Sequence, residues 1–414
     1  MVHHTMSTSS TSASSASNRI NPMQKLLGSH IVGSLAMTLP LLLIGCSSPP
    51  APVSAPTAAP QPTVTTPPKV TPASAPSSNT ASFVNAKSRW VLASWSDLPG
   101  LANDNLNEAW TAWLQSCTRS ATAHKKFCPE VQQLSNQPSS VQRDWLIKSF
   151  QPYRVESLTG NAAPSTGLLT AYYEPIFEAT RNAKPGFNVP LYGVPSNLKS
   201  KSPWFSRDEI LKNSAAQAAL KGKELAYIAD PVDAMVLHIQ GSGRLWVTQA
   251  DGSRRQIRLA FAGTNDHPYQ SIGRWLLDQN LTKDATWPGI KNWLAQNPHR
   301  ATELLSKNPR YVFFKEEALN GNDVQLGPKG AQGVPLTPGR SIAVDPGSIP
   351  YGMPVWLSSS GPQTQLNRLV MAQDTGSAIV GAVRADYFVG SGQAAGDLAG
   401  RLKQDMKMWI LLPR

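Results

Sequence analysis

The uneven placement of proline limits most strongly what this chain can fold into. Ten of its 35 prolines lie between residues 47 and 80, where alanine, serine and threonine fill most other positions. Such a segment has no apolar periodicity and cannot form a core, so it is typical of an extended tether of ~3.1 Å per residue. The chain is thereby divided into a short leading segment and a body from residue 82 onward that is long enough for two domains.

The leading segment has the pattern of an export signal. Lys25 precedes an apolar stretch that is too short and too interrupted to span a membrane well, and this stretch ends in Leu-Ile-Gly-Cys at 43–46. The ending resembles the lipobox of bacterial lipoproteins, in which the cysteine is acylated and becomes the first mature residue. We therefore expect a signal peptide at 1–45 and a lipidated Cys46 with its tether at 46–81. An ordinary cleaved signal with an incidental cysteine is the alternative.

The residue after the cysteine suggests where the anchor lies. Ser47 rather than aspartate follows Cys46, and by resemblance to sorted lipoproteins this favours the outer membrane, with the body facing the periplasm. Acyl chains contribute ~0.8 kcal/mol for each buried methylene, so several chains together hold a protein at a membrane.

The net charge of +12 is compatible with several kinds of anionic partner. The sequence has no run of five or more lysines and arginines and no nucleic-acid-binding motif, so we expect no nucleic-acid partner. It also has no GxGxxG pattern and no phosphate-binding loop, which argues against a nucleotide enzyme.

Two cysteines remain besides Cys46. Cys117 and Cys128 are separated by ten residues, and a disulfide between them is possible in an oxidising compartment, although the spacing alone does not decide it. His124 lies between them, but two cysteines and one histidine do not complete a zinc site. We predict no metal and no cofactor.

The body is predicted to be mainly β with a few helices. Helical patterns cover 104–117, with Asp104 as its N-cap, then 141–152, and 204–220, with Ser206 and Glu209 as a capping box. Short β-branched and aromatic runs separated by glycine and proline predict strands within 168–175, 234–245, 311–316, 341–357 and 368–381. This pattern favours β-barrels over a parallel α/β sheet.

Three aspartates follow apolar strand residues near the C-terminus: Asp345, Asp374 and Asp386. Burial at the wall of a barrel raises a carboxyl pKa and keeps the group protonated, as a proton donor to a glycosidic bond must be. Asp345 before Pro-Gly and Asp374 before Thr-Gly can equally be turn formers.

The surrounding motifs resemble those of the MltA family of membrane-bound lytic murein transglycosylases, whose "3D" domain is named for three aspartates. The resemblance rests on VDP and IPYG at 344–352, DTGSAIVG at 374–381 and RADYFVG at 384–390. It extends to LTAYYEP at 169–175, HIQGSGRL at 238–245, GTNDHPYQSIGRWL at 263–276 and NPRYVFF at 308–314, in the family's order. Departures are Ser377 in place of a second glycine, Val380 where lysine is common, and Met353 after IPYG.

The resemblance implies a double-psi β-barrel formed by 82–177 and 313–414, a second β-domain inserted at 178–312, and a glycan groove between them. It implies cleavage of the β-1,4 bond between MurNAc and GlcNAc in peptidoglycan, leaving a 1,6-anhydro-MurNAc end. The family's catalytic aspartate corresponds to Asp386, and Asp374 corresponds to a groove residue near it. One carboxylate can suffice, because the attacking C6 hydroxyl belongs to the same sugar.

Further residues are candidates for the groove. Tyr172 and Tyr173 could stack on sugar rings, although barrel core is the alternative and strand alternation points them to opposite sides. Gln240 and the turn at Gly241, Ser242 and Gly243 would let a bulky glycan approach the backbone. We predict that His238 is a structural histidine on a strand.

The sequence is also compatible with two other functions. One is a polysaccharide hydrolase that uses Asp386 with Asp374 as base, and the other is a non-catalytic murein-binding lipoprotein. The expected partners are peptidoglycan strands, the outer membrane through the lipid anchor, and other murein synthases and hydrolases. The sequence does not decide whether cleavage starts at chain ends.

Overall fold

The computed structural model describes residues 82–414 apart from 159–163, 200 and 250, so the expected signal segment, Cys46 and the tether lie outside the described residues. Two β-sheets organise the body, one of nine strands and one of six. The fold is mainly β with a few helices, which confirms the predicted class. Among the described residues, no helix has the length and apolar character needed to cross a bilayer.

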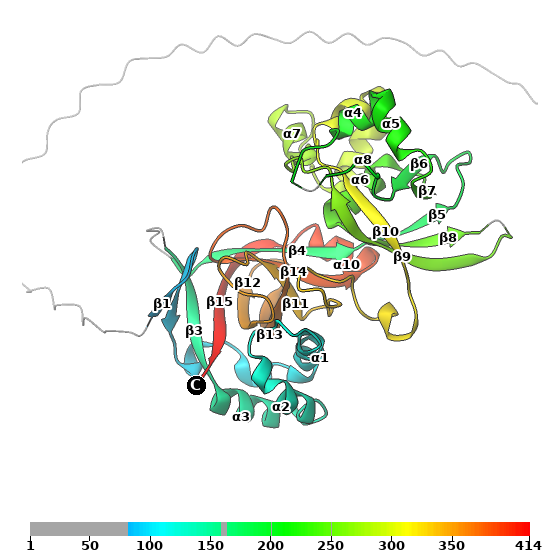
Figure 1. The fold of residues 1–414 in the computed structure, drawn as a ribbon. Coiled ribbons are helices and arrows are strands. Elements are labelled where there is room, and N and C mark those ends of the chain that lie inside the picture. Colours follow the sequence, from blue (N-terminus) through cyan, green and yellow to red (C-terminus); the bar gives the residue numbers. More distant parts are fainter. Residues whose placement is uncertain (1–81, 159–163, 200, 250) are drawn as a thin grey trace, which may run out of the picture. The chain divides into compact units, whose positions relative to one another are not determined.

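The nine-stranded sheet closes on itself into a barrel. Its strands are β1 (Ser82–Val84), β2 (Ser88–Leu92), β3 (Phe150–Ser157), β4 (Gly167–Glu174), β11 (Ser341–Val344), β12 (Pro354–Ser360), β13 (Gln365–Asp374), β14 (Arg384–Ser391) and β15 (Lys403–Pro413). Their order is β1-β2-β3-β15-β12-β13-β11-β14-β4, and β15 also pairs with β4, so the strands from β15 round to β4 form a ring. Both ends of the body therefore build one barrel, as Figure 1 shows where β3 lies beside the red β15.

The middle of the chain forms the six-stranded sheet. Its strands are β5 (Ile176–Thr180), β6 (Val189–Tyr192), β7 (Glu224–Ile228), β8 (Gly243–Thr248), β9 (Arg254–Thr264) and β10 (Val312–Ala318), in the order β10-β9-β8-β5-β7-β6. Its helices are α4 (Arg207–Lys212), α5 (Ser214–Leu220), α6 (Pro231–Gln240), α7 (Ile272–Asp278), α8 (Trp287–Gln296) and α9 (Ala301–Ser306). Because the chain enters this sheet directly after β4 and leaves it before β11, it is a second β-domain inserted into the barrel.

A buried ionic cluster ties the barrel to the inserted domain. Glu174, at the end of β4, is fully buried and accepts hydrogen bonds from Arg244 Nε at 2.7 Å and Arg258 Nε at 2.5 Å. Both arginines also donate to the carbonyl of Leu326, in the segment that returns to the barrel. The chain segment that leaves the barrel after β4 and the segment that returns to it are thus held together by this cluster.

Three helices pack on the barrel before β3. They are α1 (Leu106–Cys117), α2 (Cys128–Gln133) and α3 (Ser139–Ser149). A further helix, α10 (Gln393–Ala399), precedes β15. Short 3-10 helices lie at Trp95–Asp97, Leu101–Asn103, Lys125–Phe127, Pro298–Arg300 and Gly321–Val324. The predicted apolar face of the first helix is confirmed, because Leu106, Trp110 and Trp113 are buried against barrel residues such as Trp356.

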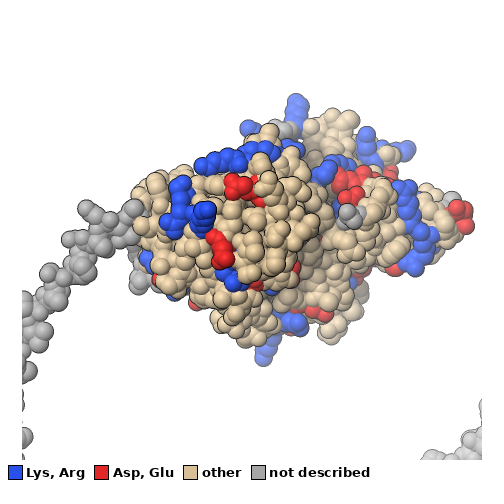
Figure 2. All heavy atoms as spheres, turned by 90° about the horizontal axis from the view of Figure 1, so that it is seen from below, with Lys and Arg blue, Asp and Glu red and all other residues tan. Residues whose placement is uncertain are grey.

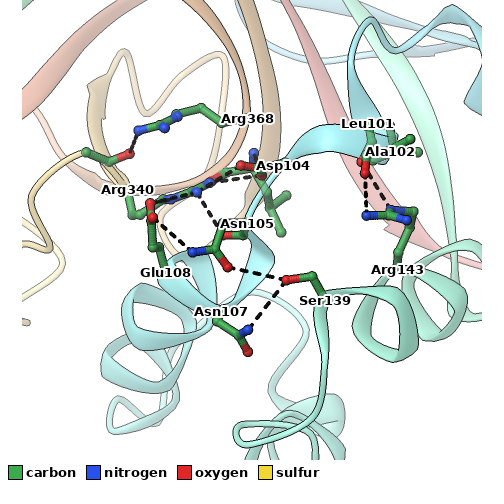
Figure 3. Close-up of polar contacts among 12 residues, drawn as sticks. Leu101, Ala102, Asp104, Asn105, Asn107, Glu108, Ser139, Arg143, Arg340 and Arg368 are labelled. Carbon is green, nitrogen blue, oxygen red and sulfur yellow. Dashed lines mark hydrogen bonds and ion pairs between the residues drawn. The ribbon is translucent and has the colours of Figure 1, made fainter.

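The role predicted for Asp104 as the N-cap of this helix is wrong. The helix begins at Leu106 with Asn105 as its N-cap residue, and Asp104 accepts hydrogen bonds from Arg340 Nη1 at 2.9 Å and Nη2 at 2.8 Å. The Arg340 side chain is fully buried and also reaches Glu108 at 2.8 Å (Figure 3). A buried guanidinium needs a carboxylate, and this requirement outweighs a local cap.

Cys117 and Cys128 form a disulfide, with their Cα atoms 5.6 Å apart. The loop that it closes rests on the barrel, where Thr122 Oγ1 accepts a hydrogen bond from Gln332 Nε2 at 3.1 Å and Ala123 donates its backbone N–H to the carbonyl of Tyr351. The bridge that the spacing left open is therefore present.

The strand predicted across 234–245 is wrong for its first half. Residues up to Gln240 form helix α6, which Asp230 caps through Val232 N and which has Pro231 in its first turn. The residues from Val232 to His238 include buried side chains on every face, so no amphipathic period marks the helix in the sequence. His238 is consequently a helical residue.

Two predicted helix boundaries also need correction. The helix predicted at 204–220 is two helices, because Asn213 adopts an extended conformation and caps the second through Ala215 N, while the Ser206–Glu209 capping box is confirmed. The helix predicted at 141–152 ends at Ser149, because Phe150 to Pro152 pair with β15 instead.

Candidate active site

Strand pairing aligns two of the three aspartates across the barrel wall. Asp374 on β13 is the register partner of Ala343 on β11, Ala343 pairs with Asp386 on β14, and Asp386 pairs with Thr170 on β4. Neighbouring strands lie ~4.8 Å apart, so the backbones of Asp374 and Asp386 are roughly 10 Å apart, with one strand between them. Residues more than 200 positions apart in the chain thus share one row.

Asp386 has the surroundings of a proton donor. Burial raises the pKa of its carboxyl, while a hydrogen bond from Thr170 and the charge of Arg384 act in the opposite direction without cancelling the rise. Thr170 Oγ1 donates to Asp386 Oδ1 and accepts a hydrogen bond from Arg384 Nη2 at 2.7 Å. The carboxyl is therefore held in one orientation and stays protonated to higher pH than a solvated aspartate.

Asp374 is held by two donors. The Tyr172 hydroxyl donates to Asp374 Oδ2 at 2.8 Å, and the backbone N–H of Ala331 donates to Oδ1 at 2.9 Å. Burial raises the pKa of Asp374, hydrogen bonds from Tyr172, Ala331 and the backbone of Thr375 oppose the rise, and the neighbouring charge of Asp386 adds to it. Burial and the charge of Asp374 also raise the pKa of Tyr172 well above its ordinary value, so the phenol remains a donor.

Asp345, by contrast, has a structural role. Burial would raise its pKa, but Lys87 Nζ at 2.8 Å and the backbone N–H groups of Gly381 and Gly347 bind the carboxylate, and the pKa is lowered. Its bonds to Gly347 and Gly381 stabilise the turns around it, in agreement with the turn-forming interpretation. Asp345 does not line either of the cavities described next.

Two adjoining cavities lie between the barrel and the inserted domain. The smaller, of about 250 Å³, is lined by both Asp374 and Asp386, and the larger, of about 510 Å³, is lined by Asp374 but not by Asp386. Residues from the inserted domain complete both: His238, Ile239, Gln240 and Arg310. Together they form the groove between domains that the resemblance implied.

The predicted groove residues are distributed unequally. Tyr172 and Gln240 line both cavities, and Gly241 and Ser242 line the larger one. Tyr173 lines neither and packs against α10, where a Cβ at Gly396 would lie 2.8 Å from its ring.

Gly243 lines neither cavity, and internal packing explains why it is glycine. A Cβ there would lie 2.1 Å from Leu237 Cδ2. Gly241, in contrast, ends α6 with a φ of 79°, in the left-handed region that favours glycine.

Several groove residues were not singled out from the sequence. Thr170, Arg310 and Tyr269 line the smaller cavity, and Phe261, with half of its surface exposed, lines the larger one. Thr170, Tyr269 and Arg310 lie inside motif segments, but only their tertiary positions distinguish them from neighbouring polar residues. In the described part of the chain, no cluster of three or more His, Cys, Asp or Glu side chains could hold a metal ion.

Comparisons with known proteins relate both parts of the body to one family. Residues 168–315 match the MltA specific insert domain, and residues 340–412 match the 3D domain. The membrane-bound lytic murein transglycosylase A of Vibrio cholerae is 31% identical over 311 residues, which cover 70% of this chain and 77% of that protein.

Solved structures agree with this relationship. The lytic transglycosylase LtgG of Burkholderia pseudomallei is 41% identical, with a TM-score of 0.55, and the match covers 78% of this chain and 95% of that one. MltA from Neisseria gonorrhoeae is 29% identical, with a TM-score of 0.66, and the match covers 81% of this chain and 95% of the other.

Proposed function

This chain belongs to the MltA family of membrane-bound lytic murein transglycosylases, and on that basis we propose that Asp386 is the single catalytic acid and base of its reaction. The protein is accordingly a lyase that acts on peptidoglycan. The observation that carries the assignment of Asp386 is its raised pKa in the smaller cavity, where Thr170 orients the carboxyl.

The reaction requires one proton to be given and one to be taken. Asp386 protonates the oxygen that links MurNAc to GlcNAc, and the bond from this oxygen to C1 of MurNAc breaks. The C6 hydroxyl oxygen of the same MurNAc then bonds to C1, and the Asp386 carboxylate accepts the hydroxyl proton. No water is added, and a 1,6-anhydro-MurNAc end remains. Attack within one sugar proceeds with effective molarities on the order of 10⁵ M or more, so a second activating base is not required.

Asp374 is better suited to holding sugar than to acting as the base of a hydrolase. Both of its oxygens already accept hydrogen bonds, from Tyr172 and Ala331, and its pKa is raised rather than lowered. A base that activates water needs a free, ionised oxygen next to that water. We therefore assign Asp374, Tyr172, Gln240, Gly241 and Ser242 to substrate binding.

The family is membrane-bound, and the N-terminal sequence supplies a means of attachment. We propose that Cys46 is acylated, that residues 46–81 are the tether, and that the body acts on peptidoglycan from the periplasmic face of the outer membrane. Replacing Cys46 with alanine should move the protein from the membrane to the soluble periplasmic fraction while activity in vitro is retained. Unchanged membrane partition would contradict the lipid anchor.

The catalytic assignment is tested with Asp386→Asn, which keeps the shape of the side chain but cannot transfer the proton. Release of muropeptides from purified murein should fall by ~10²–10⁴ or more, because both half-reactions use the residue, while binding to murein persists. Asp405→Asn, on the exposed side of β15, is the matched control and should have wild-type activity. Mass spectrometry of the products is equally informative: anhydro-muropeptides are lighter than hydrolysed ones by one water. Reducing ends as the main wild-type product, or full activity of Asp386→Asn, would refute the proposal.

A further inference from the structure

Among the residues that the structure describes, Arg310 is an arginine in the groove whose charge has no carboxylate partner. It lies just before β10, is half-buried and lines both cavities. Its backbone is fixed on both sides, because its N–H donates to Asn308 Oδ1 at 3.3 Å and its carbonyl accepts a hydrogen bond from Arg207 Nη2 at 2.6 Å. Within the described part of the chain, its guanidinium makes one hydrogen bond, from Nη1 to the carbonyl of His267 at 3.2 Å.

Three arginines that are buried more deeply than Arg310 have the carboxylate partners that it lacks. Arg340, Arg244 and Arg258 each form ion pairs with buried carboxylates at 2.5–2.8 Å. Within the described residues, Arg310 makes no ion pair, and the nearby Asp266 acts on it only at longer range. A guanidinium has five N–H donors arranged to bind a carboxylate through two parallel hydrogen bonds. Most of the donors of Arg310 are therefore available to a ligand in the groove.

A second cation lines the larger cavity from the barrel side. Lys329 is exposed and lies in the segment from Pro328 to Ala331, whose last residue binds Asp374. The backbone of this segment is held by a bridge between Lys329 and Pro335. No ion pair of Lys329 occurs among the residues that the structure describes.

The acids of the groove do not balance these two cations. The carboxylates that line the cavities are Asp374 and Asp386, and burial raises the pKa of both, which favours their neutral forms. Elsewhere, lysines and arginines are dispersed: on the face shown in Figure 2, blue patches are separated by uncharged surface, and several have red atoms beside them. The groove thus combines enclosure with uncompensated positive charge, and both strengthen the binding of an anion.

The glycan itself offers no anion, but its side arms do. An unsubstituted strand of N-acetylated sugars is neutral, whereas each muramoyl residue carries a lactyl arm that continues into a peptide with free carboxylates. We propose that Arg310 and Lys329 form a carboxylate-binding site that recognises the side arm of a muramoyl residue, so that the enzyme selects acidic, arm-bearing strands over neutral glycan. This inference rests on the proposed function and specifies its substrate.

The position of the site indicates which kinetic constant it controls. Lys329 lines the larger cavity, which Asp386 does not line, so a group that Lys329 binds lies away from the bond that breaks. Interactions that are equal in the bound substrate and the transition state lower KM and leave kcat unchanged. We therefore expect loss of Lys329 to act mainly on KM.

The experiment compares native murein strands with strands whose carboxylates have been converted to neutral amides by carbodiimide coupling. For the wild type, amidation should reduce kcat/KM about tenfold, as expected for loss of a charge-assisted hydrogen bond. For Arg310→Met and Lys329→Met, the ratio of kcat/KM for native strands to kcat/KM for amidated strands should fall towards one. Arg310→Lys should recover part of the preference for native strands. Arg255→Met, which removes an exposed charge from β9 away from both cavities, is the matched control and should retain the wild-type ratio.

A third substrate identifies the source of the carboxylate. Amidase treatment removes the peptides and leaves a free carboxylate on each lactyl group. In native strands the lactyl carboxyl is bound in the amide to the peptide, so this carboxylate is new. If the wild type cleaves the amidase-treated strands with a higher kcat/KM than the same strands after carbodiimide amidation, the site reaches the lactyl position. If the two values are equal, the site binds carboxylates of the peptide. If Arg310→Met keeps the wild-type ratio of native to amidated rates while its melting temperature is unchanged, the carboxylate site is refuted. Reducing ends among the wild-type products would instead refute the proposed function, so the two failures are distinguishable.

Discussion

Replacing Thr170 with valine should move the pH dependence of catalysis to higher pH. The Thr170 hydroxyl donates a hydrogen bond to Asp386 Oδ1, and this bond favours the ionised carboxylate. Burial raises the pKa of Asp386, whereas the hydrogen bond from Thr170 and the charge of Arg384 lower it in part. Valine keeps nearly the same shape without the hydroxyl, so it removes one of the two opposing interactions.

The size of the shift follows from the energy of that bond. A hydrogen bond to a charged group contributes about 1.5–3 kcal/mol. Because one pKa unit corresponds to about 1.4 kcal/mol, the pKa of Asp386 should rise by about one to two units. A general acid must be protonated in the free enzyme, so kcat/KM falls as the pH rises through its pKa. The descending limb of the profile should therefore move to higher pH by about one unit or more.

The assay is the initial rate of anhydro-muropeptide release from murein across acidic, neutral and alkaline pH. Thr170→Ser keeps the hydroxyl and serves as the control, with a profile close to that of the wild type. Arg384→Met removes a positive charge that lowers the same pKa, so it should shift the limb in the same direction. A descending limb that stays in place or moves to lower pH in Thr170→Val would refute the role of Asp386 as the titrating acid.

Three further predictions concern stability. Replacing Cys117 and Cys128 with serine should lower the free energy of unfolding by about 3 kcal/mol, because the disulfide closes a loop with a sequence separation of 11. The melting temperature of the variant should therefore be lower than that of the wild type, and an unchanged melting temperature would contradict this. Glu174→Ala should cost about 3–5 kcal/mol in urea denaturation, because it leaves the guanidiniums of Arg244 and Arg258 buried without a carboxylate, and a loss below 1 kcal/mol would contradict this. The pKa of Asp345 is lower in the folded than in the unfolded protein. The ionised carboxylate therefore stabilises the folded state above the unfolded-state pKa, and this contribution is lost as the pH falls through the folded-state pKa. Urea midpoints of the wild type and Asp345→Asn should thus differ at neutral pH and converge in acid, and a constant difference would contradict the ionised role.

Local patterns predicted much of the fold. The Ser206–Glu209 capping box needs only residues three positions apart, and the apolar face of α1 needs only a helical period, so both could be recognised without tertiary information. Helix α6 could not, because it is buried on all sides and its sequence lacks the polar face that distinguishes a surface helix from a buried strand. Asp104 likewise looked like a cap, because its actual partner, Arg340, is 236 residues away.

Some features of the candidate site could likewise be predicted from the sequence, and others required the tertiary structure. The sequence by itself determined that an aspartate-rich, mainly β body follows a proline-rich tether, and its motifs indicated the family and Asp386. Only the tertiary structure decided which aspartates share the groove: Asp374 and Asp386 lie in one row of the barrel, whereas Asp345 is neutralised by Lys87. The physical reason is that a carboxyl pKa depends on burial and on neighbours in space, and closure of the barrel brings Thr170 to Asp386 across 216 residues of sequence.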